Sequence, residues 1–209
     1  HRYLDQHPDV YLSPIKEINY YSKEDINPAH FTKDYRHDIS IDLPKYFRDG
    51  MPYPVHIAHV TDEKDYLHLF SKAGNAKAIG EMSLSYMLYE HTAKRIFESN
   101  PKAKIIAILR NPADRAFSQY MMNLKQGKIL ETDFIKEVVQ DDAQEIKGWG
   151  ANHQYLMIGK YYEQLKRYFD CFPKEQIKIF LFDDYQKNPD KIVEEMFDFL
   201  EVNHQIAIN

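Results

Sequence analysis

Two short runs of apolar and β-branched residues, each bounded by polar turn residues, predict strands most clearly in this chain. They are Lys104–Leu109 and Ile177–Phe182. The first run is almost continuously apolar, which is typical of a parallel strand covered on both faces. Weaker patterns of the same kind predict strands at residues 76–80 and 55–60.

Helical periodicity separates and follows these strands. Helices are predicted at residues 62–72, 86–99, 112–125, 155–169 and 189–200. Because strands and helices alternate, we expect an α/β fold of three layers, with a central, mostly parallel sheet flanked by helices. Residues 27–53 contain scattered Pro, Asp and aromatic residues and are predicted to be an irregular excursion of the kind that often borders a binding cleft.

Length and composition fit a single domain over residues 1–209, and a hydrophobic fraction of 44% is enough to enclose a core. The net charge of −5 comes from charges of mixed sign without a basic run, so no nucleic-acid partner is expected. No apolar run reaches membrane-spanning length, so no membrane partner is expected, and the single cysteine, Cys171, favours a reducing, cytoplasmic setting. The ten histidines show no metal-ligand spacing, so no metal is expected.

The segment from Arg110 to Ser118 predicts an anion-binding site where a strand ends and a helix begins. The Asn-Pro pair after Arg110 suits a helix cap and first turn, so free backbone N–H groups and the helix dipole favour a negative ligand there. The Arg110 guanidinium and the Ser118 hydroxyl can clamp one phosphate. A second interpretation is equally open at this point: Arg110 and Arg115 can pair with Asp114 or with neighbouring acidic residues at the helix start, which needs no ligand.

The same nine residues resemble the 3′-phosphate-binding motif of the sulfotransferases that use 3′-phosphoadenosine 5′-phosphosulfate (PAPS). That motif has an arginine at a strand end and a serine eight residues later, and the matching positions are Arg110 and Ser118. Further motifs of the family occur in order at residues 7–10, 16–21, 80–86, 159–162, 172–173, 182–184 and 188–189. Their number and order support the resemblance, which implies a P-loop-like domain of the bacterial or heparan-type group that binds PAPS and its product PAP.

The resemblance also implies a catalytic base, Glu17. In the heparan-type sulfotransferases, the glutamate of a segment similar to residues 16–21 takes the proton of the acceptor. Neighbouring apolar and aromatic residues can raise the pKa of the Glu17 carboxyl, whereas Lys16 lowers that pKa if it lies close, and the sequence leaves this balance open. Without the resemblance, Glu17 is one of 32 acidic residues and is more simply interpreted as an exposed loop carboxylate.

Two departures from the family pattern affect this interpretation. Met82 stands where the related motif often has lysine, although Glu81 and Ser83 beside it are expected to line the acceptor side. No Lys-x-Gly-Thr-Thr loop, which wraps the 5′-phosphosulfate in the family, occurs before His7, and the basic loop expected near the carboxyl end is also missing. We therefore expect residues 1–209 to be a domain truncated at the N-terminus, with truncation at the C-terminus also open. Without the missing loop, these residues are expected to bind the donor weakly and to be inactive in transfer.

The activity implied by the resemblance is transfer of a sulfuryl group from PAPS to a hydroxyl or amine of a carbohydrate or small-molecule acceptor. The sequence does not predict the oligomeric state. Two alternatives are kept. One is a noncatalytic module that binds PAP or another nucleotide. The other is a P-loop nucleotide kinase, which needs a Walker-type lysine loop and magnesium-binding residues that the sequence lacks.

Overall fold

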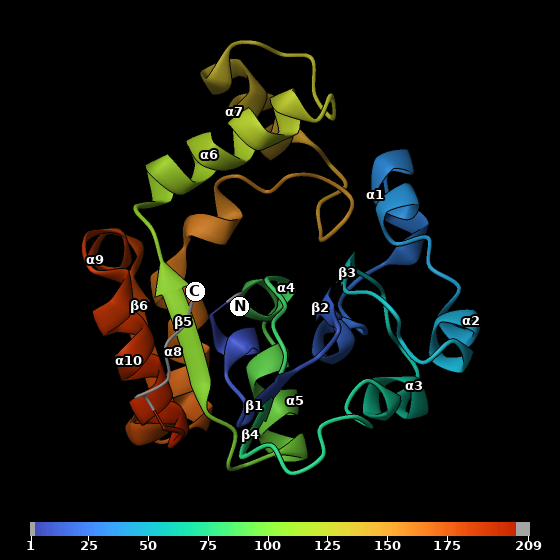
Figure 1. Ribbon diagram of the computed structural model, residues 1–209. Coiled ribbons are helices and arrows are strands. Elements are labelled where there is room, and N and C mark those ends of the chain that lie inside the picture. The colour runs from blue at the N-terminus through green and yellow to red at the C-terminus, as the bar shows by residue number, and fades with distance from the viewer. Residues whose placement is uncertain (1–2, 204–209) are drawn as a thin grey trace.

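In a computed structural model that describes residues 3–203, the strands pair in parallel (Figure 1). The pairs are β1 (Val10–Leu12) with β4 (Ala78–Gly80), β2 (Ile15–Glu17) with β3 (Val55–Ile57), and β5 (Ile105–Leu109) with β6 (Ile177–Leu181). Parallel partners need long crossover connections, and helices lie in each of these connections. The chain is therefore an α/β protein.

Helices surround the strand pairs and also form a separate upper part of the molecule. In chain order they are α1 (Lys33–Asp38), α2 (Leu43–Arg48), α3 (Glu63–His68), α4 (Ser85–Leu88), α5 (Thr92–Ser99), α6 (Pro112–Lys125), α7 (Phe134–Ala143), α8 (Tyr161–Cys171), α9 (Phe182–Lys187) and α10 (Pro189–Leu200). Figure 1 shows α9 and α10 beside β5 and β6, α1 to α3 on the side of β2 and β3, and α6 with α7 above both. None of the helices in the described part of the chain has the length and apolar content that a bilayer crossing requires.

The clearest sequence patterns predicted their elements closely. Strands β5 and β6 lie within one residue of their predicted ends, and α6 and α10 begin and end at the predicted residues. Both helices have a local cap, because the Asn111 side chain accepts from the Ala113 N–H at 3.0 Å and the Asn188 side chain accepts from the Lys191 N–H at 3.2 Å. Such caps are visible in a few consecutive residues, so local sequence is enough to place them.

Other predictions were wrong. Residues 27–53, predicted to be irregular, contain α1 and α2, whose first turns are capped by Thr32 and Asp42. Each helix has six residues, which is too short for an apolar period to stand out. The helix predicted over residues 86–99 is broken into α4 and α5, because Tyr89 has an extended backbone. The three-residue strands β1 and β2 were not predicted.

Two packed clusters cover parts of the strands. Behind β2 and β3, Ile15, Ile18 and Leu69 are fully buried in a cluster shared with α2 and α3. Behind β5 and β6, Tyr168 and Phe172 pack with residues of α5. Full burial of one large aliphatic side chain contributes about 1.5 to 3 kcal/mol. The cluster around Ile15 and Ile18 therefore supports the end of β2, whereas the cluster around Tyr168 and Phe172 covers the amino ends of β5 and β6 through Ile105 and Ile177.

Candidate active site

The segment after β5 has the predicted strand-turn-helix geometry but not the predicted backbone donors. Strand β5 ends one residue before Arg110, and α6 begins at Pro112. The side chain of Asn111 accepts from the N–H groups of Ala113 and Asp114, at 3.0 and 3.4 Å, and proline has no N–H. The expectation of free N–H groups in the first turn was therefore wrong, because Asn111 already uses them. The helix dipole and the Arg110 side chain remain to attract an anion.

The two arginines of this segment have different surroundings. Arg115 donates to a glutamine one turn further along α6, at 2.7 Å, and to the Tyr155 carbonyl, so it ties α6 to the loop after α7. Arg110 instead lies with its guanidinium carbon 5.2 Å from the centre of the Phe182 ring. Within residues 3–203, no hydrogen bond or ion pair is seen for Arg110, and neither arginine pairs with Asp114. The structure therefore does not show the alternative in which these arginines pair with acidic residues at the start of the helix.

Ser118 lies on the same helix and is exposed. It is six residues beyond Pro112, or about 9 Å along the axis at 1.5 Å per residue. In the described part of the chain its hydroxyl makes no hydrogen bond to another side chain. A phosphate held by both Arg110 and Ser118 would lie along the flank of the first two turns of α6, and this ligand role stays a prediction.

Glu17 is the last residue of β2, and only 4% of it is exposed. The Leu84 N–H donates to its Oε2 atom at 2.7 Å. Burial raises the pKa of the Glu17 carboxyl, and the Leu84 N–H and the charge of Lys16 offset that rise only in part. The balance that the sequence left open therefore favours a raised pKa, which makes the carboxylate a stronger base than an exposed glutamate.

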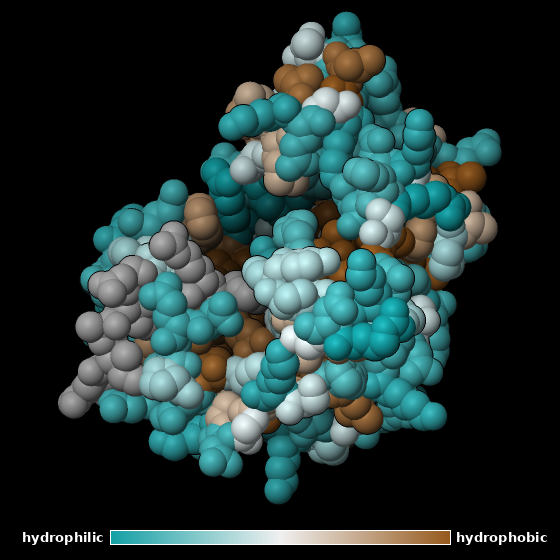
Figure 2. Space-filling model, turned by 45° about the vertical axis from the view of Figure 1, so that its right-hand side comes forward, coloured by the Kyte–Doolittle hydropathy of each residue, from teal (hydrophilic) through white to brown (hydrophobic). Residues whose placement is uncertain are grey.

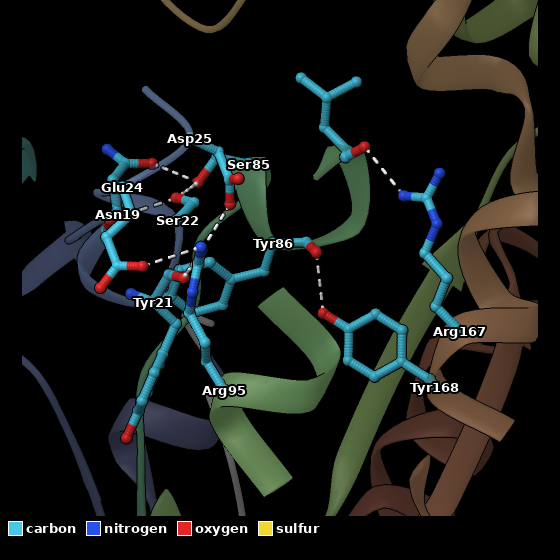
Figure 3. A network of polar contacts seen from close by, with 11 residues as sticks. Asn19, Tyr21, Ser22, Glu24, Asp25, Ser85, Tyr86, Arg95, Arg167 and Tyr168 are labelled. Atoms are coloured by element: carbon cyan, nitrogen blue, oxygen red, sulfur yellow. Dashed lines mark hydrogen bonds and ion pairs between the residues drawn. The ribbon is translucent and has the colours of Figure 1, made fainter. Parts of the chain in front are cut away.

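A network of hydrogen bonds holds the backbone next to Glu17. The Ser83 hydroxyl oxygen accepts from the N–H groups of Ile18 and Asn19, each at 3.0 Å. Asn19 has a left-handed backbone with φ of 60°, and its side-chain oxygen accepts from the Ser85 hydroxyl at 2.6 Å (Figure 3). These bonds join the end of β2 to Ser83, which precedes α4, and to Ser85, the first residue of α4, so they fix the position of Glu17.

Helix α4 is also held from its other side. Figure 3 shows the Tyr168 hydroxyl donating to the Tyr86 carbonyl, at 2.9 Å. Arg167 donates to the Leu88 carbonyl, at 3.0 Å. Both donors belong to α8. The carbonyl groups at the end of α4 thus have partners, and α4 links the core behind β6 to the network around Glu17.

Ser83→Ala is expected to lower the free energy of unfolding by about 1 to 3 kcal/mol, because two buried N–H groups lose their acceptor. The matched control is Ser71→Ala at an exposed position, with an expected change below about 0.5 kcal/mol. Denaturant unfolding of both variants measures the difference. Equal unfolding free energies for the two variants would show that the Ser83 hydroxyl does not support this network.

A second carboxyl group, Glu81, lies close enough to Glu17 to be affected by its charge. Glu81 accepts from the hydroxyls of Tyr66 and Tyr86, each at 2.8 Å. Burial raises the pKa of Glu81 to about 7, the two tyrosine hydrogen bonds lower it in part, and the charge of Glu17 adds to the rise. Because Tyr66 belongs to α3 and Tyr86 to α4, Glu81 connects these two helices beside the candidate base.

The raised pKa of Glu81 gives an expected pH dependence of stability. Between the ordinary value of 4.5 and about 7, the folded protein holds a proton on Glu81 that the unfolded chain releases. The free energy of unfolding should therefore fall as pH rises through this window, relative to Glu81→Gln, in which position 81 does not titrate. Denaturant unfolding of both proteins at several pH values measures the difference. A difference that does not change between pH 4.5 and 7 would contradict the assignment.

Sequence reasoning expected Glu81 and Ser83 near the acceptor but did not find Asn19, Tyr66 or Tyr86 as parts of this site. The contacts of these residues join positions as far as 66 apart, and no local pattern signals such pairs. The usable signal was the family resemblance of two separate segments, one around Glu17 and one around Glu81. The structure places those two segments side by side.

Comparison with known proteins identifies the family of the chain. The sulfotransferase domain family matches residues 31–208. The chain belongs to the sulfotransferase family. A crystal structure of a sulfotransferase from Alicyclobacillus acidocaldarius is 31% identical, with a TM-score of 0.83, and the match covers 100% of this chain and 77% of that one. The predicted P-loop-like α/β fold is thereby confirmed.

Curated sulfotransferases are more distant. The membrane-associated sulfotransferase kil1 of Dictyostelium discoideum is 22% identical over an alignment of 281 positions. This alignment covers 97% of this chain and 53% of that protein. The human bifunctional heparan sulfate N-deacetylase/N-sulfotransferase 2 is 28% identical over 141 residues, which cover 66% of this chain and 16% of that protein. This sulfotransferase chain thus spans about half, or less, of the length of these two relatives.

Proposed function

We propose that the protein transfers a sulfuryl group from PAPS to a hydroxyl or amine of a carbohydrate or small-molecule acceptor. Glu17 would take the proton of the acceptor, and Arg110 and Ser118 would hold the 3′-phosphate of the donor. Membership of the sulfotransferase family supports the class of reaction. The observation that carries the proposal is the burial of Glu17, whose carboxylate is fixed by the Leu84 N–H and has a raised pKa.

The base is suited to its proposed task in two respects. A general base works best when its pKa is close to the working pH, and burial moves the pKa of Glu17 in that direction. The hydrogen bond from Leu84 engages Oε2, which leaves Oε1 to face an acceptor. The network through Ser83 then limits the movement of the carboxylate while the proton is transferred.

The donor site fits a phosphate at Arg110. The guanidinium lies on the Phe182 ring and has no carboxylate partner in the described residues, so binding an anion would break no ion pair. PAPS supplies the sulfuryl group. PAP is the leaving group, and the bond that breaks joins the sulfur to the 5′-phosphate of PAP. The proposal covers the 3′-phosphate and the base, and assigns no residue to the 5′-phosphosulfate. A single domain and a cytoplasmic location are further parts of the proposal, based on composition and on Cys171.

Titration calorimetry of the full-length protein tests the donor assignment. PAP is expected to bind roughly 10- to 150-fold more tightly than adenosine 5′-monophosphate, which lacks the 3′-phosphate. This range corresponds to one charge-assisted hydrogen bond of about 1.5 to 3 kcal/mol. Equal affinities for the two nucleotides would contradict a 3′-phosphate site. Tight PAP binding without any transfer would favour the noncatalytic module instead.

A further inference from the structure

The carboxyl group of Glu81 collects three hydroxyl donors next to the candidate base. The hydroxyls of Tyr66 on α3 and Tyr86 on α4 donate to its two oxygens, each at 2.8 Å. The Ser83 hydroxyl also hydrogen-bonds to this carboxyl and lowers its pKa in part. Three hydroxyl donors on one carboxyl group suit the ionised form, because a carboxylate accepts hydrogen bonds and donates none.

These polar groups lie inside the molecule. Figure 2 shows hydrophilic side chains over most of one outer face, with a recess below the part that carries α6 and α7, along which hydrophobic side chains gather. Ser83 and Tyr86, in contrast, are each only 8% exposed. Since buried hydroxyl groups are nearly always paired with protein groups, the acceptor that they find decides how they are oriented, and Glu81 is that acceptor.

Ser83 connects Glu81 to the backbone that follows the base. The Ser83 oxygen accepts from the N–H groups of Ile18 and Asn19, each at 3.0 Å, which uses both of its lone pairs. Its single proton is therefore left to donate, and the Glu81 carboxyl lies within its reach. An ionised Glu81 fixes this proton, so both lone pairs of Ser83 stay directed at the two N–H groups that follow Glu17.

A proton on Glu81 changes this arrangement. The protonated carboxyl is itself a donor, so at least one of the three hydroxyls has to turn away from it. The Ser83 hydroxyl then has the Tyr86 oxygen as its other acceptor within reach. The titratable groups that interact with Glu81 are Glu17 of β2, Tyr66 of α3, Tyr86 of α4 and Tyr168 of α8, and Tyr21 is linked to it through Tyr66 and Tyr86. None of these described groups is a cation that would hold Glu81 ionised.

We propose that Glu81, in its ionised form, is a positioning residue for the candidate base: through Ser83 it holds the backbone that follows Glu17 and so keeps the Glu17 carboxylate directed at the acceptor. This rests on the proposed function, because it assigns a further residue to the same reaction. Glu81 itself touches neither donor nor acceptor. Since its pKa is about 7, the network around the base is complete only above that pH, for a reason separate from the titration of Glu17.

The amide proton resonances of Ile18 and Asn19 report on this link without any need for turnover. In nuclear magnetic resonance spectra of the full-length protein, both resonances are expected to shift with an inflection near pH 7, because their acceptor Ser83 is reoriented when Glu81 takes a proton. The inflection should be absent in Glu81→Gln. The matched control is Glu90→Gln at an exposed position, in which the inflection should remain.

Glu17→Gln separates the effects of the two carboxyl groups. The inflection should remain in this variant and move to lower pH, because the charge of Glu17 adds to the raised pKa of Glu81. An inflection that is lost in Glu17→Gln and persists in Glu81→Gln would overturn the proposal. Calorimetry with PAP on the same preparations separates it from the proposed function. If PAP binds and wild type shows no inflection near pH 7, the positioning role is wrong and the proposed function stands; if PAP does not bind, the proposed function fails.

The effect of Glu81→Gln on transfer should also depend on pH. Glutamine is a neutral mimic of the protonated carboxyl, so the variant should resemble wild type most closely at low pH. Single-turnover transfer from PAPS to benzyl β-D-glucopyranoside, a neutral carbohydrate, is measured for both proteins at about pH 5 and about pH 8, on either side of the pKa of Glu81. The ratio of the wild-type rate to the variant rate should rise roughly 10- to 50-fold between them, close to the loss that displacement of a reacting group by about 1 Å causes. A purely structural role would lower the melting temperature and give the same ratio at both pH values, which would overturn the proposal.

Discussion

Glu17→Gln is expected to lower turnover roughly 10²- to 10⁴-fold, the usual contribution of general base catalysis, while PAP affinity is unchanged. Glutamine has the size of glutamate and can still accept the Leu84 N–H, but it cannot take a proton from the acceptor. The raised pKa means that the buried site disfavours the charged form of Glu17 in the folded protein. Replacement by neutral glutamine removes this cost, so the variant should be at least as stable as wild type near pH 7. Steady-state rates at saturating PAPS and acceptor, with melting curves of the same preparations, measure both effects.

The matched control for that variant is Glu194→Gln, at an exposed position on α10. Its turnover should equal that of wild type. A structural role for Glu17 would give the opposite pattern: a lower melting temperature, with near-normal turnover in the protein that remains folded. Near wild-type turnover of Glu17→Gln, under conditions where chemistry limits the rate, would show that another residue is the base.

Arg110→Ala is expected to weaken PAP binding roughly 10- to 150-fold, because it removes a charge-assisted hydrogen bond of about 1.5 to 3 kcal/mol. Ser118→Ala removes a neutral hydrogen bond of about 0.5 to 1.5 kcal/mol, so its loss should be only about 2- to 10-fold. In both variants the affinity for adenosine 5′-monophosphate should be unchanged, since that nucleotide has no 3′-phosphate. Calorimetry with the two nucleotides measures these differences.

Arg115→Ala provides the contrasting variant in the same helix. Arg115 ties α6 to the Tyr155 carbonyl, so its loss should lower stability and leave the PAP affinity of the folded protein unchanged. If Arg115→Ala weakens PAP binding and Arg110→Ala does not, the phosphate assignment is wrong. The comparison is informative because the two arginines are five residues apart and differ in their hydrogen bonds.

The parts of the fold that sequence predicted are those encoded within a few residues. Helices α6 and α10 were placed correctly because an Asn-Pro pair begins each of them. Strand β1 was missed because its three residues gain their structure from pairing with β4, in a register that joins Val10 to Ala78. The split between α4 and α5 was missed for a similar reason, since the extended residue Tyr89 is held by contacts with the loop around Trp149.

The residues of the candidate site likewise fall into those that local sequence predicts and those that need the tertiary structure. Arg110 and Ser118 lie in one segment and could be proposed together from local spacing, whereas Glu17 was proposed through the family resemblance. The pKa of Glu17 depends on burial and on Leu84, which is 67 positions away, so its direction needed the structure. The place of Ser83 beside the end of β2 likewise depends on tertiary packing.

A single-turnover experiment tests directly whether Glu17 is the base of a sulfuryl transfer from PAPS. Full-length enzyme in excess over PAPS is mixed with benzyl β-D-glucopyranoside, and PAP and sulfated glucoside are separated and quantified over time. Both products should appear at the same rate and in equal amounts in wild type, and both should appear roughly 10²- to 10⁴-fold more slowly in Glu17→Gln. Formation of the sulfated product by Glu17→Gln at the wild-type rate would contradict the role of Glu17 as the base.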